Sequence, residues 1–159
     1  MKFSTQEEYG LRLLLRIAKS DSPNGLTIPE LSEVEGLSSA NTAKILRALR
    51  LAGFIESARG QTGGYKLNQS ADKILISDVL TALGGKLYEQ DFCSLHAGVE
   101  NICTNSIDCS IRSVWKTVQN VLDGVLSKFT LQDLLGNEED VEALALSFAE
   151  ELEIKFNKN

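Results

Sequence analysis

The stretch IPELSEVEGLSSANTAKILRALRLAGFIESARGQTGGYKL, residues 28–67, decides the fold of this chain. Its first part carries the signals of a short helix, because Thr27 and Glu30 have capping-box spacing and Gly36 supplies a stop. A second helix is predicted from 38–53, where apolar residues recur at helical spacing after a serine pair. Two short helices joined by a tight turn that contains glycine form a helix-turn-helix arrangement.

The rest of the stretch predicts a β-hairpin. FIESA (54–58) has the composition of a short strand, RGQTGG (59–64) that of a turn, and YKLNQ (65–69) alternates apolar and polar residues as a returning strand does. Ahead of the stretch, apolar residues at helical spacing predict a further helix over 5–19. Three helices followed by a hairpin make a winged helix-turn-helix domain. The expected fold is therefore mainly α with a small β-hairpin wing.

Helical spacing returns in three segments after the hairpin. Residues 76–87 have one apolar face, and an apolar stripe from Ile111 to Phe129 predicts a long dimerisation helix of about five turns. Trp115 on this stripe is expected to be packed in the core. Residues 141–156 predict a final amphipathic helix. We expect a DNA-binding domain over 1–75, then the connecting helix, the cysteine loop (91–110) and the dimerisation helix within 76–135, and a C-terminal helical extension over 136–159.

Charge differs between the two parts of the chain. Residues 1–70 hold nine Lys or Arg against seven Asp or Glu, whereas residues 71–159 hold seven against fifteen. A locally basic half can bind DNA although the whole chain has a net charge of −6. No apolar run approaches the ~20 residues that a membrane span needs, and the start MKFSTQEEYGLRLLL lacks the basic region of an export signal. The expectation is a soluble cytoplasmic protein with no membrane partner.

The second helix of the pair supplies the candidate DNA-reading surface. Small polar residues near its start suit base edges, and cations further along suit phosphates. In the hairpin, glycines let the backbone approach a nucleic acid, and an arginine at the wing tip can enter a narrow minor groove. A solvated helix face or a plain hairpin turn would each share these features alone, so their combination favours DNA binding. The candidate DNA-binding residues are Ser38, Ser39, Asn41, Thr42, Lys44 and Arg47 on the helix and Arg59, Gly60, Gly63, Gly64 and Tyr65 on the wing.

All three cysteines and the only histidine of the chain lie in CSLHAGVENICTNSIDC (93–109). In a reducing cytosol, clustered thiols are more often metal ligands or redox groups than structural bridges. Cys93, Cys103 and Cys109 show none of the CxxC pairs that are typical of zinc sites. Three widely spaced thiolates on one loop suit an iron–sulfur cluster, which is bulkier than one ion.

With these residues in place, the chain resembles the IscR, NsrR and RirA family of bacterial winged-helix regulators over about residues 1–135. The resemblance rests on MKFSTQEEYGLRLLLRIA, on the helix-turn-helix with its RG…GGY wing, on ISDVLTALGG, and on three cysteines ahead of a long helix. It implies a 2Fe-2S or 4Fe-4S cluster held by the loop cysteines, although nine residues between the first two is a wider gap than the family usually has.

The resemblance also implies a fourth cluster ligand. In some members an acidic residue on the first helix of the partner subunit completes the cluster, and Glu8 occupies the matching place. Glu7 is a rival for this role, and the loop histidine His96 is another. An exchangeable or absent fourth ligand is a further alternative.

The expected function is that of a homodimeric repressor that binds a pseudo-palindromic operator in double-stranded DNA. The cluster is expected to control DNA affinity in response to iron or cluster supply, oxidant or nitric oxide. The alternative is a metal-free redox switch in which Cys103 and Cys109 form a disulfide. A non-sensing interaction module is a third possibility. An enzyme is not expected, because the sequence has no nucleophile motif and no phosphate-binding loop.

Overall fold

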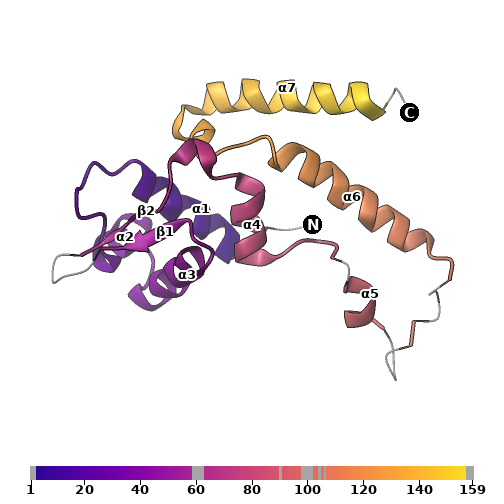
Figure 1. Cartoon of the computed structure of the whole chain (residues 1–159), viewed down its shortest axis with the longest axis horizontal. Helices are drawn as coiled ribbons and strands as arrows, with labels where there is room; N and C mark the ends of the chain where they lie inside the picture. The colour runs from indigo at the N-terminus through magenta and orange to yellow at the C-terminus, as the bar shows by residue number, and fades with distance from the viewer. Residues whose placement is uncertain are drawn as a thin grey trace.

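The structure, a computed structural model, describes residues 3–58, 63–89, 91–97, 102–103, 105 and 107–156, with side-chain detail as far as Glu151 (Figure 1). In chain order its elements are α1 (Thr5–Ala18), α2 (Ile28–Glu35), α3 (Ser39–Leu51), β1 (Ile55–Ser57), β2 (Tyr65–Leu67), η1 (Ala71–Lys73), α4 (Ile76–Gly84), α5 (Phe92–Leu95), α6 (Ser110–Leu126), η3 (Asp133–Leu135) and α7 (Glu138–Phe156). None of these described helices is both long and apolar enough to cross a membrane.

Local signals set the bounds of the helix-turn-helix. The side chain of Thr27 accepts the backbone N–H of Glu30, whose carboxylate accepts the backbone N–H of Thr27, so the predicted capping box is confirmed. Gly36 ends α2 in the left-handed conformation at φ +66°, where a side chain would be strained. Ser38 is the N-cap of α3, because its hydroxyl accepts the backbone N–H of Asn41.

The predicted wing is confirmed as a two-stranded antiparallel hairpin. β1 pairs with β2 so that Ile55 lies opposite Leu67 and Ser57 lies opposite Tyr65. Leu26 adds an isolated bridge to Tyr65 on the outer side of β2. The hairpin is therefore fastened to the loop between α1 and α2 as well as to the end of α3.

One hydrophobic core lies beneath these elements. Its fully buried members come from α1, α2, α3, β1 and α4 and from the segments that flank α4 and follow α6; they include Leu13, Leu14, Leu31, Ile45, Leu46, Leu49, Ile55, Ile74, Val79 and Leu131. Leu131 belongs to the chain after α6, which returns to the winged domain. There the N–H of Ile76 donates to the carbonyl of Phe129, and the N–H of Leu131 donates to the carbonyl of Ile74.

Two expectations about the long helix are wrong. The helix ends at Leu126 rather than at Phe129, because the Phe129 ring is buried in the core and its carbonyl bonds the start of α4. Trp115 is not packed in the core, since 45% of its surface is exposed in the single chain. The helix at 76–87 is also shorter than predicted: it ends at Gly84, and Gly85 adopts φ +77°.

The C-terminal helix is part of the same core. α7 begins at Glu138, three residues earlier than predicted, and runs from near α4 along the end of α6 (Figure 1). Phe148 contacts the Phe129 ring edge to face at 5.0 Å between centroids. Lys128 stands over the Phe148 ring and forms an ion pair with Glu151. α7 therefore covers an apolar surface that would otherwise face solvent.

Candidate functional site

Most of the DNA-binding residues predicted on the second helix of the pair lie on the exposed side of α3. Ser39, Lys44 and Arg47 are exposed, and Asn41 is half-buried. The hydroxyl of Ser38 is exposed but engaged as the helix cap. The two exposed cations, Lys44 and Arg47, lie about one turn apart on this face.

The prediction that Thr42 faces DNA is wrong. Thr42 is fully buried, because it lies on the helix face that also carries Ile45, Leu46 and Leu49. Its hydroxyl accepts a hydrogen bond from the hydroxyl of Ser32 on α2 at 3.0 Å. A side chain held in this way cannot reach a base edge, and it fixes the two helices of the motif to each other.

Of the five wing candidates, Arg59 and Gly60 lie outside the described residues. Gly64 has a packing role, since a Cβ on it would come within 2.7 Å of the backbone of Gly25 and Leu26. Tyr65 is half-buried and bonded through its backbone to Leu26. Gly63 is the described wing glycine closest to the turn. The close backbone approach that explains Gly64 is therefore internal to the domain.

An ion-pair cluster that the sequence analysis missed orients the helix-turn-helix against α1. The Glu35 side chain, only 2% exposed, accepts from Arg12 Nε at 2.7 Å and from Arg16 Nε at 2.6 Å. Burial alone would raise the pKa of the Glu35 carboxyl, but the hydrogen bonds and charges of Arg16 and Arg12 outweigh it and hold the pKa below its ordinary value. The signal available in the sequence was a glutamate at the position on α2 that an apolar core residue would occupy.

All three cysteines line one cavity of about 250 Å³ beside the start of α6. Each thiol is free and half-buried. Cys93 lies on α5, a short helix that the sequence analysis did not expect, and Cys109 is the N-cap of α6. The cavity is further lined by Tyr88, Phe92, His96, Asn105, Ile111, Arg112 and Trp115. The fold thus gathers residues up to 27 positions apart around the thiols, at the end of α6 remote from the wing (Figure 1).

This cavity is not a finished metal site. Among the residues that the structure describes, no three His, Cys, Asp or Glu side chains lie together as a metal-binding group. The three soft sulfur donors fit an iron–sulfur cluster chemically. A four-ligand set needs one further donor besides the three thiols.

The proposed fourth ligands differ in how they are engaged. The carboxylate of Glu7 accepts the N–H of Ser4 at 2.6 Å and so caps its own helix. The neighbouring Glu8 side chain is exposed and does not line the cysteine cavity of its own chain. His96 lines the cavity, its ring stacks on Phe92, and its Nδ1 lies 2.8 Å from the Phe92 carbonyl.

Two cysteines have defined neighbours. The Cys109 sulfur accepts the backbone N–H of Arg112 at 3.4 Å in the first turn of α6. The Cys93 sulfur lies 4.0 Å from the hydroxyl of Tyr88. Loss of solvent raises the pKa of the Tyr88 phenol, the Cys93 thiol raises it further, and the charge of Arg112 opposes that rise. Cys93, Tyr88 and Arg112 therefore share one electrostatic environment.

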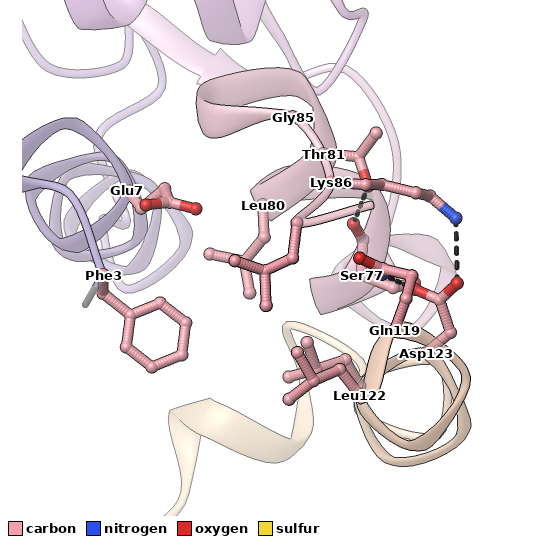
Figure 2. A pocket seen from close by; sticks show the side chains of 12 residues that line it. Phe3, Glu7, Ser77, Leu80, Thr81, Gly85, Lys86, Gln119, Leu122 and Asp123 are labelled. Atoms are coloured by element: carbon pink, nitrogen blue, oxygen red, sulfur yellow. Dashed lines mark hydrogen bonds and ion pairs between the residues drawn. The ribbon is translucent and has the colours of Figure 1, made fainter. Parts of the chain in front are cut away.

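A polar chain connects this environment to the middle of α6. The backbone N–H of Tyr88 donates to Gln119 Oε1 at 3.1 Å, and Gln119 Nε2 donates to Asp123 Oδ1 at 2.8 Å. Asp123 Oδ2 accepts from Lys86 Nζ at 3.0 Å. Figure 2 shows Lys86, Gln119 and Asp123 along one side of a second, mostly apolar pocket between α1, α4 and α6. Phe3, Leu80 and Leu122 face one another across it (Figure 2).

A helix-turn-helix with a hairpin wing, followed by a long helix that starts beside clustered cysteines, is the architecture of a winged helix-turn-helix transcriptional regulator. The chain belongs to the Rrf2 family, whose model, described as an iron-dependent transcriptional regulator, matches residues 3–137. The resemblance found in the sequence is thereby confirmed.

Individual relatives agree with this assignment. The chain is 34% identical over 136 residues to protein rrf2 of Nitratidesulfovibrio vulgaris. The aligned region covers 85% of this chain and 87% of that protein. The chain is 27% identical over 146 residues to the HTH-type transcriptional regulator NsrR of Bacillus licheniformis, with 91% and 99% covered. CymR, the global cysteine regulator of B. subtilis, has a similar structure, with a TM-score of 0.65 at 27% identity over 85% of this chain and 96% of that chain. Neither the family description nor these names denote an enzyme.

Proposed function

We propose that this regulator binds DNA as a homodimer and that an iron–sulfur cluster held by Cys93, Cys103 and Cys109 controls its DNA affinity. The observation that carries the proposal is the convergence of all three thiols on one cavity at the start of α6. The description of the family as iron-dependent supports it, as does the likeness to NsrR. The regulated output is transcription, with repression as the expected direction.

The three cysteines and one further group would hold the cluster. Because Glu8 is exposed and Glu7 is engaged in capping, Glu8 of the partner subunit is the preferred fourth ligand, with His96 as the rival from the same loop. A bound 2Fe-2S or 4Fe-4S cluster supplies a group that iron shortage, oxidant or nitric oxide can remove or modify. A hard carboxylate on a soft cluster would be a labile bond, which suits a sensor.

The face of α3 would read the operator. Lys44 and Arg47 meet phosphates, while Ser39 and Asn41 at the helix start lie where base edges are read. This surface is local, since the chain as a whole is acidic. DNA affinity should therefore fall steeply with salt, as it does when a few lysine and arginine contacts supply most of the attraction.

The long helix would form the dimer interface. Ile111, Val114, Trp115 and Val121 on α6 are all exposed in the single chain, at 37–59% of their surface. A contiguous apolar stripe of this kind is typical of a surface that a partner covers. Packed against its twin, α6 would place two recognition helices on two half-sites of a pseudo-palindromic operator.

A thiol switch without metal is the second candidate. The structural likeness to CymR favours it, as do the three free thiols. In this version Cys103 and Cys109 would join in a disulfide under oxidation, and Cys93 would remain a thiol.

Anaerobic purification with an absorbance spectrum and iron and sulfide assays separates the two candidates. Visible iron–sulfur bands with matching iron and sulfide are expected, and Cys103→Ala should lose them. Ser94→Ala, a change at an exposed serine in the same segment, should keep them. A colourless protein that takes up no cluster on reconstitution, but forms a disulfide on mild oxidation, would replace the cluster by the thiol switch.

A further inference from the structure

Arg112 stands out in the charge pattern around the cysteines. Between residues 87 and 115 it is the single Lys or Arg, against four Asp or Glu. It lies in the first turn of α6, where the helix dipole disfavours a cation. The dipole of its own helix therefore does not account for a positive charge at this position.

The geometry directs Arg112 towards the thiols. It lines the cavity together with Cys93, Cys103 and Cys109. Its backbone N–H donates to the Cys109 sulfur at 3.4 Å, and one guanidinium nitrogen reaches the Asn105 carbonyl at 3.5 Å. The Arg112 side chain is therefore part of the lining of the cavity that the three thiols share.

We infer that Arg112 is the charge-compensating residue of the cysteine cavity, where its positive charge stabilises the anionic cluster held by the three thiolates. The inference rests on the proposed function. A cluster with thiolate ligands becomes more negative when it accepts an electron, so a nearby cation favours the reduced state and raises the reduction potential. Arg112 is a positioning and tuning residue in this scheme, since it tunes the cluster without being one of its ligands.

A purely structural role for Arg112 would require hydrogen-bond donors but not a positive charge. If Arg112 only fastened the loop through hydrogen bonds, such as the one to the Asn105 carbonyl, a neutral hydrogen-bond donor could replace it. If its charge matters, a lysine is the better replacement. Arg112→Gln and Arg112→Lys therefore separate the two roles. Lys116→Gln removes the same charge from an exposed position one turn further along α6 and is the matched control.

The test is a reductive titration of the reconstituted full-length protein with dithionite, in which the visible spectrum of the cluster is recorded after each addition. Arg112→Gln should lower the equilibrium constant for reduction of the cluster about tenfold. For a one-electron couple this is a reduction potential about 59 mV more negative. Arg112→Lys and Lys116→Gln should stay close to the wild type. An unchanged potential in a cluster-bearing Arg112→Gln protein overturns the inference alone, and equal shifts for Arg112→Gln and Lys116→Gln overturn it as well. A wild-type protein that takes up no cluster overturns the proposed function and this inference with it.

Discussion

The backbone of Tyr88 is hydrogen-bonded to the side chain of Gln119, whose carboxamide oxygen accepts the Tyr88 N–H at 3.1 Å. Tyr88 in turn places its hydroxyl 4.0 Å from the Cys93 sulfur. Through Gln119 and Asp123 the contact continues to Lys86, which follows α4, the connecting helix. These contacts form a junction between α6 and the segment that follows α4, beside Cys93.

Replacing Gln119 with leucine should weaken this junction. The side chain is only 8% exposed, so Tyr88 N–H would lose its acceptor in a site with little water, at a cost of about 1–3 kcal/mol. Urea unfolding at one fixed chain concentration measures the loss. Asn120→Leu makes the same type of change at the exposed neighbouring position and should alter the free energy of unfolding by less than about 0.5 kcal/mol. Equal losses for both variants would refute the role of Gln119.

Stability should fall with acid because of Glu35. Its folded pKa lies below the ordinary value of 4.5, so the unfolded chain takes up the proton more readily than the folded one. The stabilisation is complete above that ordinary value and is lost as the pH falls through the lowered folded pKa.

Glu35→Gln should remove this acid-sensitive contribution to stability and lower the free energy of unfolding by about 2 kcal/mol at neutral pH. Chemical unfolding between pH 7 and 3 should then show a flatter profile than the wild type. Glu33→Gln, at an exposed position of the same helix, should keep the wild-type profile. A wild-type profile in Glu35→Gln would mean that the two arginines do not stabilise the fold through this carboxylate.

Substitutions of Arg47 and Thr42 should affect different properties, DNA affinity and stability respectively, although both residues lie on one helix. Arg47→Ala should reduce DNA affinity and the slope of log affinity against log salt by about 0.9, with little change in stability. Thr42→Val keeps the shape but leaves the Ser32 hydroxyl unpaired, so it should cost about 1 kcal/mol of stability and leave the DNA affinity of the folded protein unchanged. Fluorescence anisotropy over a salt series, with parallel unfolding, checks both; a Thr42→Val protein that folds normally but binds DNA poorly would restore Thr42 to the reading surface.

Phe148→Ala should destabilise the chain although it lies outside the segment that the family model matches. Its ring packs against buried Phe129, and because Phe148 is itself only half-buried the expected loss is roughly 1–3 kcal/mol, below that of a fully buried phenylalanine. Leu146→Ala, at a side chain that is 59% exposed, serves as the control for helix α7. Thermal unfolding should separate the two variants by several degrees; coincident curves would mean that α7 adds nothing to the core.

The apolar stripe of α6 should decide the oligomeric state. Val114→Glu places a charge in the stripe and should shift the protein towards a monomer in sedimentation equilibrium. Asn120→Glu puts the same charge on the opposite face of α6 and should leave the dimer intact. A Val114→Glu protein that stays dimeric would show that another surface forms the interface.

Features with short-range causes could be predicted from the sequence. The capping box at Thr27, the stop at Gly36 and the hairpin between β1 and β2 depend on residues a few positions apart, and the structure has them where the sequence indicates. The sequence predicted that the three cysteines share one loop, but not that they line one cavity. The parts of the lining contributed by Tyr88 and Arg112 depend on how α6 packs against that loop.

Features that depend on contacts between distant parts of the chain could not be predicted from the sequence. Thr42 is polar and lies on a helix with many polar residues, so its burial became visible only with its partner Ser32 in place. Phe129 continues the apolar spacing of α6, but the pairing of its carbonyl with Ile76 takes it out of the helix. Glu35 was not singled out in the sequence, because its partners Arg12 and Arg16 lie 23 and 19 positions away on α1.

The packing of α7 over Phe129 also has a consequence for synthesis. A ribosome makes the chain from its N-terminus, so the winged domain emerges well before the helix that completes its core. Until α7 leaves the exit tunnel, the nascent chain presents the edge of Phe129 and the apolar side of α6 to chaperones and proteases. A messenger truncated ahead of α7 would yield a polypeptide that carries every proposed DNA-binding residue and yet is a ready target for degradation.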